Sequence, residues 1–107
     1  MKAHRSQLSG QISFFDMLPL PGEYVTRHGR EITFDEAAHR IGQLVVFDRS
    51  TESHTWYQTL EIERVVMVES GPRLICYDGG KERQLINKLY FESSNYHREH
   101  AFELAVV

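Results

Sequence analysis

The fold is decided by residues 33–47, which read TFDEAAHRIGQLVVF. Thr33 and Glu36 have the spacing of a capping box, in which each side chain accepts a hydrogen bond from the other residue's backbone amide at a helix start. Apolar side chains then recur at helical spacing up to a glycine, a residue type that commonly follows a helix end. This pattern predicts a short helix over 34–41. After the helix the apolar period changes to two, so 44–47 is expected to form a compact strand.

Most of the remaining chain has the pattern of strands separated by turns. About five strands are expected, at 44–47, 54–68, 73–77, 84–86 and 102–106, with shorter extended pieces at 23–26 and 31–32. Tight turns between consecutive strands favour an antiparallel meander. We therefore expect a mainly β fold with one short helix, curled into a small, partly open barrel that is SH3-like or similar in size. The alternative is a helix packed on an open antiparallel sheet.

The length of 107 residues allows one domain with a modest core. Residues 1–22 begin without any apolar period and end in a segment interrupted by prolines, so they are expected to form a flexible N-terminal tail. A small β-barrel-like domain is then expected over 23–107. No apolar run approaches the roughly 20 residues of a membrane span, and no secretory signal is present. We therefore expect a cytoplasmic protein that does not contact membranes.

The segment Gln11-Ile12-Ser13-Phe14-Phe15 places two adjacent phenylalanines after a glutamine. It resembles the clamp-binding peptide of bacterial replication and repair proteins, roughly Gln-Leu-(Ser/Asp)-Leu-Phe. Gln11, Ser13 and Phe15 match this pattern, whereas Ile12 and Phe14 replace leucines. The resemblance implies a protein partner, a bacterial sliding clamp. Gln11 would hydrogen-bond at the rim of the clamp's pocket, and the phenylalanines would fill its apolar cleft.

The same segment has an intramolecular alternative. Phe14, Phe15, Met17 and Leu18 can instead fold back and cover an open edge or end of the protein's own sheet. In that arrangement the segment belongs to the folded domain and offers no peptide to a partner.

More widely, the chain resembles small uncharacterised proteins carried by bacterial mobile elements such as phages and plasmids. The resemblance rests on the stretches Gly42–Asp48, Ser53–Tyr57 and Cys76–Arg83. Those proteins have no assigned activity that could be transferred to these positions. The resemblance implies an accessory protein of a mobile element and assigns no site residue.

A nucleic-acid face is the second binding hypothesis. Small barrels bind single strands by stacking bases on aromatic side chains beside basic ones. The candidate residues are the aromatic Trp56, Tyr57 and Tyr77 and the basic Arg73, Lys81, Arg83 and Lys88. Neighbouring strand residues point to opposite faces, so at most one of Trp56 and Tyr57 can be an exposed platform. The net charge of −3 argues against a strong non-specific grip on phosphates.

Catalytic and metal-binding patterns are weak. His97 and His100 flank Glu99, and His54 lies near Asp48 and Glu52, but neither set has the paired spacing of a zinc site. The single cysteine, Cys76, sits in an apolar run and is expected to be a small buried hydrophobe. No nucleophile elbow, phosphate loop or dinucleotide fingerprint is present. We therefore expect a non-enzymatic binding protein without metal or cofactor. It would act through its tail or, alternatively, bind nucleic acid or a host protein through its own surface, as a defence inhibitor does.

Overall fold

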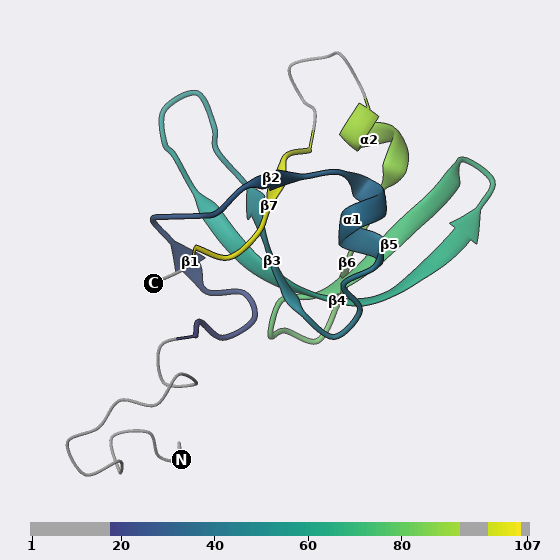
Figure 1. The fold of residues 1–107 in the computed structure, drawn as a ribbon, viewed down its shortest axis with the longest axis horizontal. Helices are drawn as coiled ribbons and strands as arrows, with labels where there is room; N and C mark the ends of the chain where they lie inside the picture. The colour runs from purple at the N-terminus through teal and green to yellow at the C-terminus, as the bar shows by residue number, and fades with distance from the viewer. Residues whose placement is uncertain (1–17, 93–98, 106–107) are drawn as a thin grey trace, which may run out of the picture.

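The computed structural model describes residues 18–92 and 99–105. In these residues the chain forms one seven-stranded antiparallel sheet and two short helices (Figure 1). The elements are β1 (Tyr24–Val25), β2 (Glu31–Ile32), α1 (Phe34–Ala38), β3 (Leu44–Asp48), β4 (Tyr57–Val68), β5 (Gly71–Tyr77), β6 (Arg83–Asn87), α2 (Lys88–Glu92) and β7 (Ala101–Phe102). The expected mainly β, antiparallel fold is confirmed, and the sheet is not a closed barrel.

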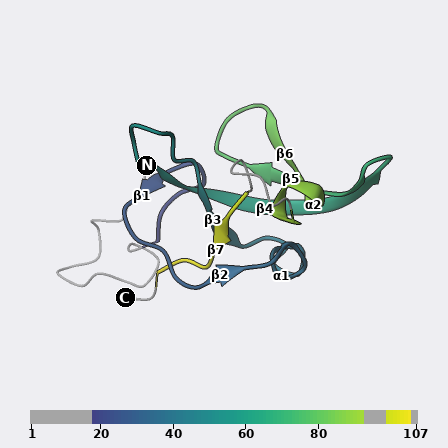
Figure 2. The same ribbon diagram turned by 90° about the horizontal axis from the view of Figure 1, so that it is seen from above.

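Strand β4 is the centre of the sheet, whose order is β2-β7-β3-β4-β5-β6, with β1 also paired to β4. Residues 57–61 of β4 pair with β3, and residues 61–68 pair with β5. A bulge between Ile62 and Arg64 interrupts the second ladder, and such bulges bend and twist a strand. Beyond this point the β4–β5 hairpin projects from the body of the protein (Figure 1 and Figure 2).

Two helices lie between the outer strands β2 and β6, which do not pair with each other within the described residues. Helix α1 follows β2 and helix α2 follows β6, so each helix continues from an edge of the sheet. The rings of Phe34 on α1 and Phe91 on α2 meet edge-on, with their centroids 5.4 Å apart. Lys88 Nζ on α2 also lies 3.6 Å from Asp35 Oδ1 on α1. The helices therefore span the opening that a closed barrel would fill with a strand pair.

The core lies on the face of the sheet that these helices cover. Alternate residues of β3 and β4, among them Val45, Phe47, Leu60 and Ile62, are completely buried there. The other members of this core cluster are Ile32, Phe34, Ala37, Leu74, Cys76, Ile86, Phe91 and Ala101. The cluster found among the described residues is thus built entirely within 32–101.

The opposite face of β4 is covered near its start by the chain that precedes β1. The Thr59 side chain is buried, and its Oγ1 lies 2.8 Å from the carbonyl oxygen of Leu20 and 3.0 Å from that of Glu23. The backbone amide of Gly22 donates to the carbonyl oxygen of Thr59 at 2.7 Å. Folded contacts therefore begin before residue 23, where the sequence places the start of the domain.

The helix predicted over 34–41 is correct at its start and wrong at its end. The capping box is present: Thr33 Oγ1 accepts from the Glu36 amide, and Glu36 Oε1 accepts from the Thr33 amide. The helix ends at Ala38. The amide of Gly42 donates to the carbonyl oxygen of Ile62 at 2.7 Å, so the chain joins β4 here instead of continuing the helix.

Other differences concern short elements. The prediction of only one helix is wrong, because α2 forms as well as α1. Helix α2 is one short turn in which only Phe91 is buried, so its sequence has no repeated pattern of buried residues. Strand β4 begins at Tyr57 rather than at residue 54, because residues 49–56 form a loop closed by the amide of Arg49 donating to Trp56 O. The last strand covers only Ala101–Phe102.

Candidate functional site

The peptide-like motif, Gln11–Phe15, lies outside the described residues, and the structure shows the point at which the following chain joins the domain. Gly22 has a φ of 89°, and a Cβ there would collide with the backbone carbonyl of Asp78. A Cβ at Gly79 would lie 2.9 Å from the carbonyl oxygen of Pro21. Residues 21–22 are therefore fitted tightly against the turn between β5 and β6, in addition to their bonds with β4.

Three exposed aromatic rings form a cluster beside this attachment point. We call Tyr24, His54 and Trp56 the aromatic cluster. The rings of Tyr24 and Trp56 meet edge-on with centroids 5.3 Å apart, and those of His54 and Trp56 are 5.7 Å apart. Tyr24 is 59% exposed and Trp56 is 42% exposed. Large aromatic side chains left at the surface are the residue types that most often dominate binding interfaces.

Tyr57, the neighbour of Trp56, has a different environment. It is half-buried, and its ring lies edge-on to His28 at 4.7 Å and to Phe102 at 6.2 Å. His28 in turn stacks on Phe102 at 3.9 Å. Tyr57 is therefore a packing residue, whereas Trp56 is available to a partner.

Two of the predicted basic residues, Arg73 and Arg83, are already held by neighbouring side chains. Arg83 Nε lies 2.9 Å from both carboxylate oxygens of Glu63, and its guanidinium lies over the Tyr77 ring at 4.6 Å. This hydrogen bond is the main cause that lowers the pKa of Glu63. Arg73 Nε donates to Asn87 Oδ1 at 2.7 Å. These contacts reduce what either guanidinium can offer a phosphate.

The two predicted lysines lie on different parts of the fold. Lys81 is exposed in the turn between β5 and β6. Lys88 begins α2, where its Nζ lies 3.6 Å from both Asp35 Oδ1 and Glu92 Oε2. Of the basic candidates, Arg83 therefore lies beside a candidate aromatic residue, Tyr77. Lys88 lies apart from them, beside Asp35 of α1.

His54 and His100, the candidate histidines that the structure describes, each contact a residue outside the sets that the sequence suggested. His54 Nδ1 lies 3.0 Å from Ser53 Oγ, and Asp48 Oδ1 accepts a hydrogen bond from the Ser50 amide. His100 Nδ1 lies 2.8 Å from Glu31 Oε2, and His97 lies outside the described residues. Within 18–92 and 99–105, no group of three or more His, Cys, Asp or Glu side chains could hold a metal ion.

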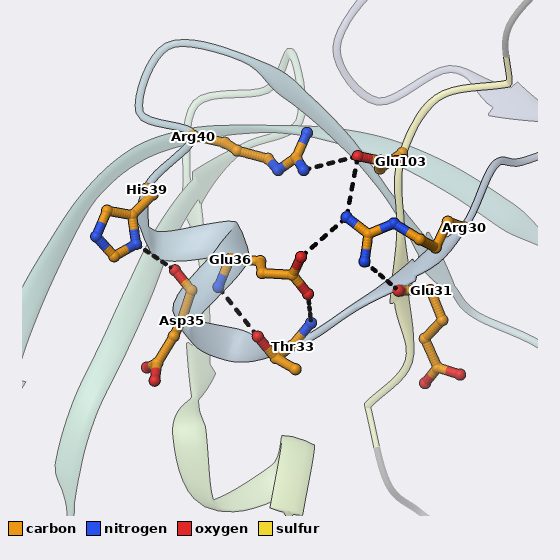
Figure 3. Close-up of polar contacts among 8 residues, drawn as sticks. All are labelled: Arg30, Glu31, Thr33, Asp35, Glu36, His39, Arg40 and Glu103. Carbon is orange, nitrogen blue, oxygen red and sulfur yellow. Dashed lines mark hydrogen bonds and ion pairs between the residues drawn. The ribbon is translucent and has the colours of Figure 1, made fainter.

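A polar network fixes α1 against the chain after β7 (Figure 3). Arg30 Nη2 lies 2.9 Å from Glu36 Oε2 and 3.3 Å from Glu103 Oε2. Arg40 Nη2 approaches the same Glu103 oxygen at 2.7 Å. The Arg30 hydrogen bond is the largest cause that lowers the pKa of Glu36, which falls to about 2. These charges neutralise one another, so the network is a structural joint.

A cavity of about 480 Å³ opens between β2, α1 and α2. Phe34 and Phe91 provide apolar lining, and the carboxylates among its lining residues outnumber the one lysine. Burial is the largest cause that raises the pKa of Glu99, which also lies 3.5 Å from Arg49. The cavity adjoins both ends of the segment 93–98, which lies outside the described residues.

The comparisons with known proteins gave no relatives. No family model matches the chain, and no curated protein and no solved structure matched it. The functional argument therefore depends on the residues themselves.

Among the described residues, the exposed aromatic cluster is the surface feature that the sequence only partly indicated. The aromatic cluster was only half visible in the sequence, because Trp56 was a candidate while Tyr24 and His54 were not linked to it. Tyr24 reaches Trp56 through the pairing of β1 with β4, which no local pattern in the sequence indicates. Among the described helices, none is long and apolar enough to cross a membrane.

Proposed function

We propose that this protein is a non-enzymatic accessory protein of a bacterial mobile element that binds a sliding clamp through Gln11–Phe15. The observation that carries the proposal is the sequence pattern of this segment. Gln11, Ser13 and Phe15 match the docking peptide that it resembles, and the adjacent Phe14 and Phe15 supply large apolar anchors.

The attachment of the chain at residues 20–23 supports the same proposal. Leu20 and Gly22 hydrogen-bond to Thr59, so a fixed point lies only a few residues after the motif. A partner that captures the motif would therefore hold the domain close to its own surface. Short segments with large apolar anchors and one orienting hydrogen bond bind through a few dominant contacts.

The direct test is a calorimetric titration of a purified bacterial sliding clamp with the full chain. A Gln11→Ala/Phe15→Ala variant should bind about tenfold more weakly or worse, because it loses the polar anchor and one apolar plug. Gln7→Ala removes the same side-chain type outside the motif and should leave binding unchanged. Equal binding by the double variant, or no binding by the wild-type chain, contradicts the proposal.

A deletion separates the tail from the domain. The structure places the cut after residue 17, because deleting residues 1–22 would also remove the partners of Thr59. The chain 18–107 should keep its melting temperature and lose clamp binding. Retained binding would assign the contact to the domain surface instead.

The second candidate function is binding of single-stranded nucleic acid through the aromatic cluster. The observation that favours it is the exposed edge-on pair of Tyr24 and Trp56. Base stacking on such rings contributes about 1–3 kcal/mol per base. A Trp56→Ala variant should then lose affinity for a labelled oligonucleotide, while Tyr90→Ala, which removes an exposed aromatic ring on α2, should not. If the wild-type protein and both variants fail to bind the oligonucleotide, nucleic-acid binding is contradicted and a host protein becomes the candidate partner of this surface.

A further inference from the structure

The aromatic cluster lies where the described chain enters the domain. Strand β1, which carries Tyr24, is the first element of the described chain, and it pairs with the start of β4, immediately after Trp56. The amide of Glu23 donates to the carbonyl oxygen of Leu20 at 3.0 Å, so Leu20 lies one turn away from Tyr24. Leu20 is itself 55% exposed. Large apolar side chains are thus exposed at this entry point.

The entry point is fixed to the sheet. Thr59 Oγ1 donates to the carbonyl oxygens of Leu20 and Glu23, at 2.8 and 3.0 Å. Gly22 donates its amide to the carbonyl oxygen of Thr59 and leaves no room for a side chain beside the Asp78 carbonyl. The aromatic cluster therefore keeps a constant position relative to Leu20.

The separation between the motif and this fixed point is short. Phe15 precedes Leu20 by five residues, and that number of extended residues spans at most roughly 17 Å. A partner that holds Gln11–Phe15 must therefore bring its surface within this distance of Leu20. The part of the domain that faces such a partner is the part around the entry point, which includes the aromatic cluster.

The charges around the cluster favour a protein surface over a phosphate backbone. The segments 20–27 and 49–56, which carry the cluster, contain the carboxylates Glu23 and Glu52 and the arginines Arg27 and Arg49. Arg49 is already held, because its Nη2 lies 2.6 Å from Gln84 Oε1. A phosphate backbone is bound through an excess of basic side chains, and these segments contain no such excess. Exposed Tyr and Trp side chains are instead enriched in protein interfaces.

We propose that the aromatic cluster is a second contact, with an apolar patch beside the pocket of the same sliding clamp that binds Gln11–Phe15; this inference rests on the proposed function. Once the clamp holds the motif, the cluster meets the clamp as an intramolecular event, at an effective concentration in the millimolar range for a short linker. A contact too weak to hold the domain by itself then adds to the affinity. Trp and Tyr are also the residue types that most often dominate an interface.

The first test compares full-length variants by calorimetric titration with a purified bacterial sliding clamp. Trp56→Ala should bind about tenfold more weakly, because it removes the largest ring of the cluster. Tyr90→Ala removes an exposed ring on α2, outside the cluster, and should leave the affinity unchanged. Equal affinities of the wild-type chain and Trp56→Ala overturn this inference and leave the proposed function standing. No binding by the wild-type chain overturns both.

A labelled single-stranded oligonucleotide tests the other occupant of the cluster. We expect Trp56→Ala to leave the affinity for the oligonucleotide unchanged while it weakens clamp binding. A loss of oligonucleotide affinity with unchanged clamp affinity would assign the cluster to nucleic acid and overturn the inference.

The last test changes the linker and leaves every side chain in place. About twenty Gly and Ser residues inserted between Met17 and Leu18 lengthen the separation about fivefold, which should lower the effective concentration about tenfold and the affinity several-fold. The same insertion between Gly10 and Gln11 keeps the separation and should have no effect. In the lengthened chain Trp56→Ala should weaken binding only about twofold, because most of the second contact is already lost. A full tenfold loss there would mean that Trp56 acts through the structure of the domain, and it would overturn the proposal.

Discussion

Arg40 Nη2 lies 2.7 Å from Glu103 Oε2, and the same carboxylate oxygen lies 3.3 Å from Arg30 Nη2. Arg40 follows helix α1, whereas Glu103 follows β7 near the end of the described chain. Arg30 continues the network to Glu36, inside the capping box (Figure 3). One carboxylate thus joins the β2–α1 corner to the chain that follows β7.

Glu103→Gln tests the strength of this joint. The substitution keeps the shape of the side chain and removes the charge that both guanidinium groups share. Because Arg40 and Glu103 are only partly buried, we expect the free energy of unfolding to fall by about 0.5–1 kcal/mol. Urea denaturation measures this change. Glu69→Gln, in the exposed turn of the β4–β5 hairpin, should change stability by less.

Acid should weaken the same corner through Glu36. Its pKa is lowered from 4.5 to about 2, first by the hydrogen bond from Arg30. A carboxylate with a lowered folded-state pKa stabilises the fold above its unfolded pKa, and this contribution is lost as the pH falls from about 4.5 toward 2. Glu36→Gln keeps a cap acceptor for the Thr33 amide and should show a smaller loss of stability over that range. Urea midpoints measured against pH provide the comparison, and equal pH dependence in both proteins contradicts the assignment. Added salt should reduce the difference, because the pair is partly exposed.

Local signals made much of this fold predictable. Thr33 and Glu36 are close in sequence, and the capping box they predict is present. A continuous apolar run predicted β3, and alternating apolar residues predicted most of β4. Gly79 has the positive φ of 90° that the expected turn requires. Such features depend on neighbours along the chain, so a single sequence contains them.

Features that depend on distant residues were not predictable. Helix α2 has one buried residue, Phe91, and its ring is buried because it packs against Phe34 of α1. The early end of α1 likewise depends on Ile62, which accepts a hydrogen bond from Gly42. Phe34 is distant in sequence from α2, and Ile62 is distant from α1, so no local apolar pattern indicates either effect.

The candidate surfaces divide in the same way. The motif Gln11–Phe15 and the exposed Trp56 could be named from residue type alone, whereas Tyr24 joined Trp56 only through the pairing of β1 with β4. The basic candidates were chosen by charge. Their partners, such as Glu63 for Arg83, became visible only in three dimensions.

The native protein should protect its single cysteine from thiol reagents. The Cys76 side chain is completely buried in the core, and desolvation is the largest cause that raises its pKa to about 12. The reactive thiolate is therefore nearly absent at neutral pH and shielded from the reagent. Labelling should be slow in buffer and fast in urea. Rapid labelling of the folded chain would place Cys76 outside the core.

Two glycines with similar backbone angles should differ in their tolerance of alanine. Gly22 has a φ of 89° and Gly42 a φ of 84°, so an alanine at either position pays the left-handed cost of about 1–2 kcal/mol. Around Gly42 no atom lies within 4 Å of the added Cβ, whereas at Gly22 the Cβ collides with the Asp78 carbonyl. Gly22→Ala should therefore reduce the free energy of unfolding by about 1–3 kcal/mol more than Gly42→Ala, since a tightly packed backbone cannot yield without strain. Urea denaturation of both variants measures the difference. Equal losses would mean that residues 20–23 are not held against the β5–β6 turn, and the attachment point behind the motif would lie elsewhere.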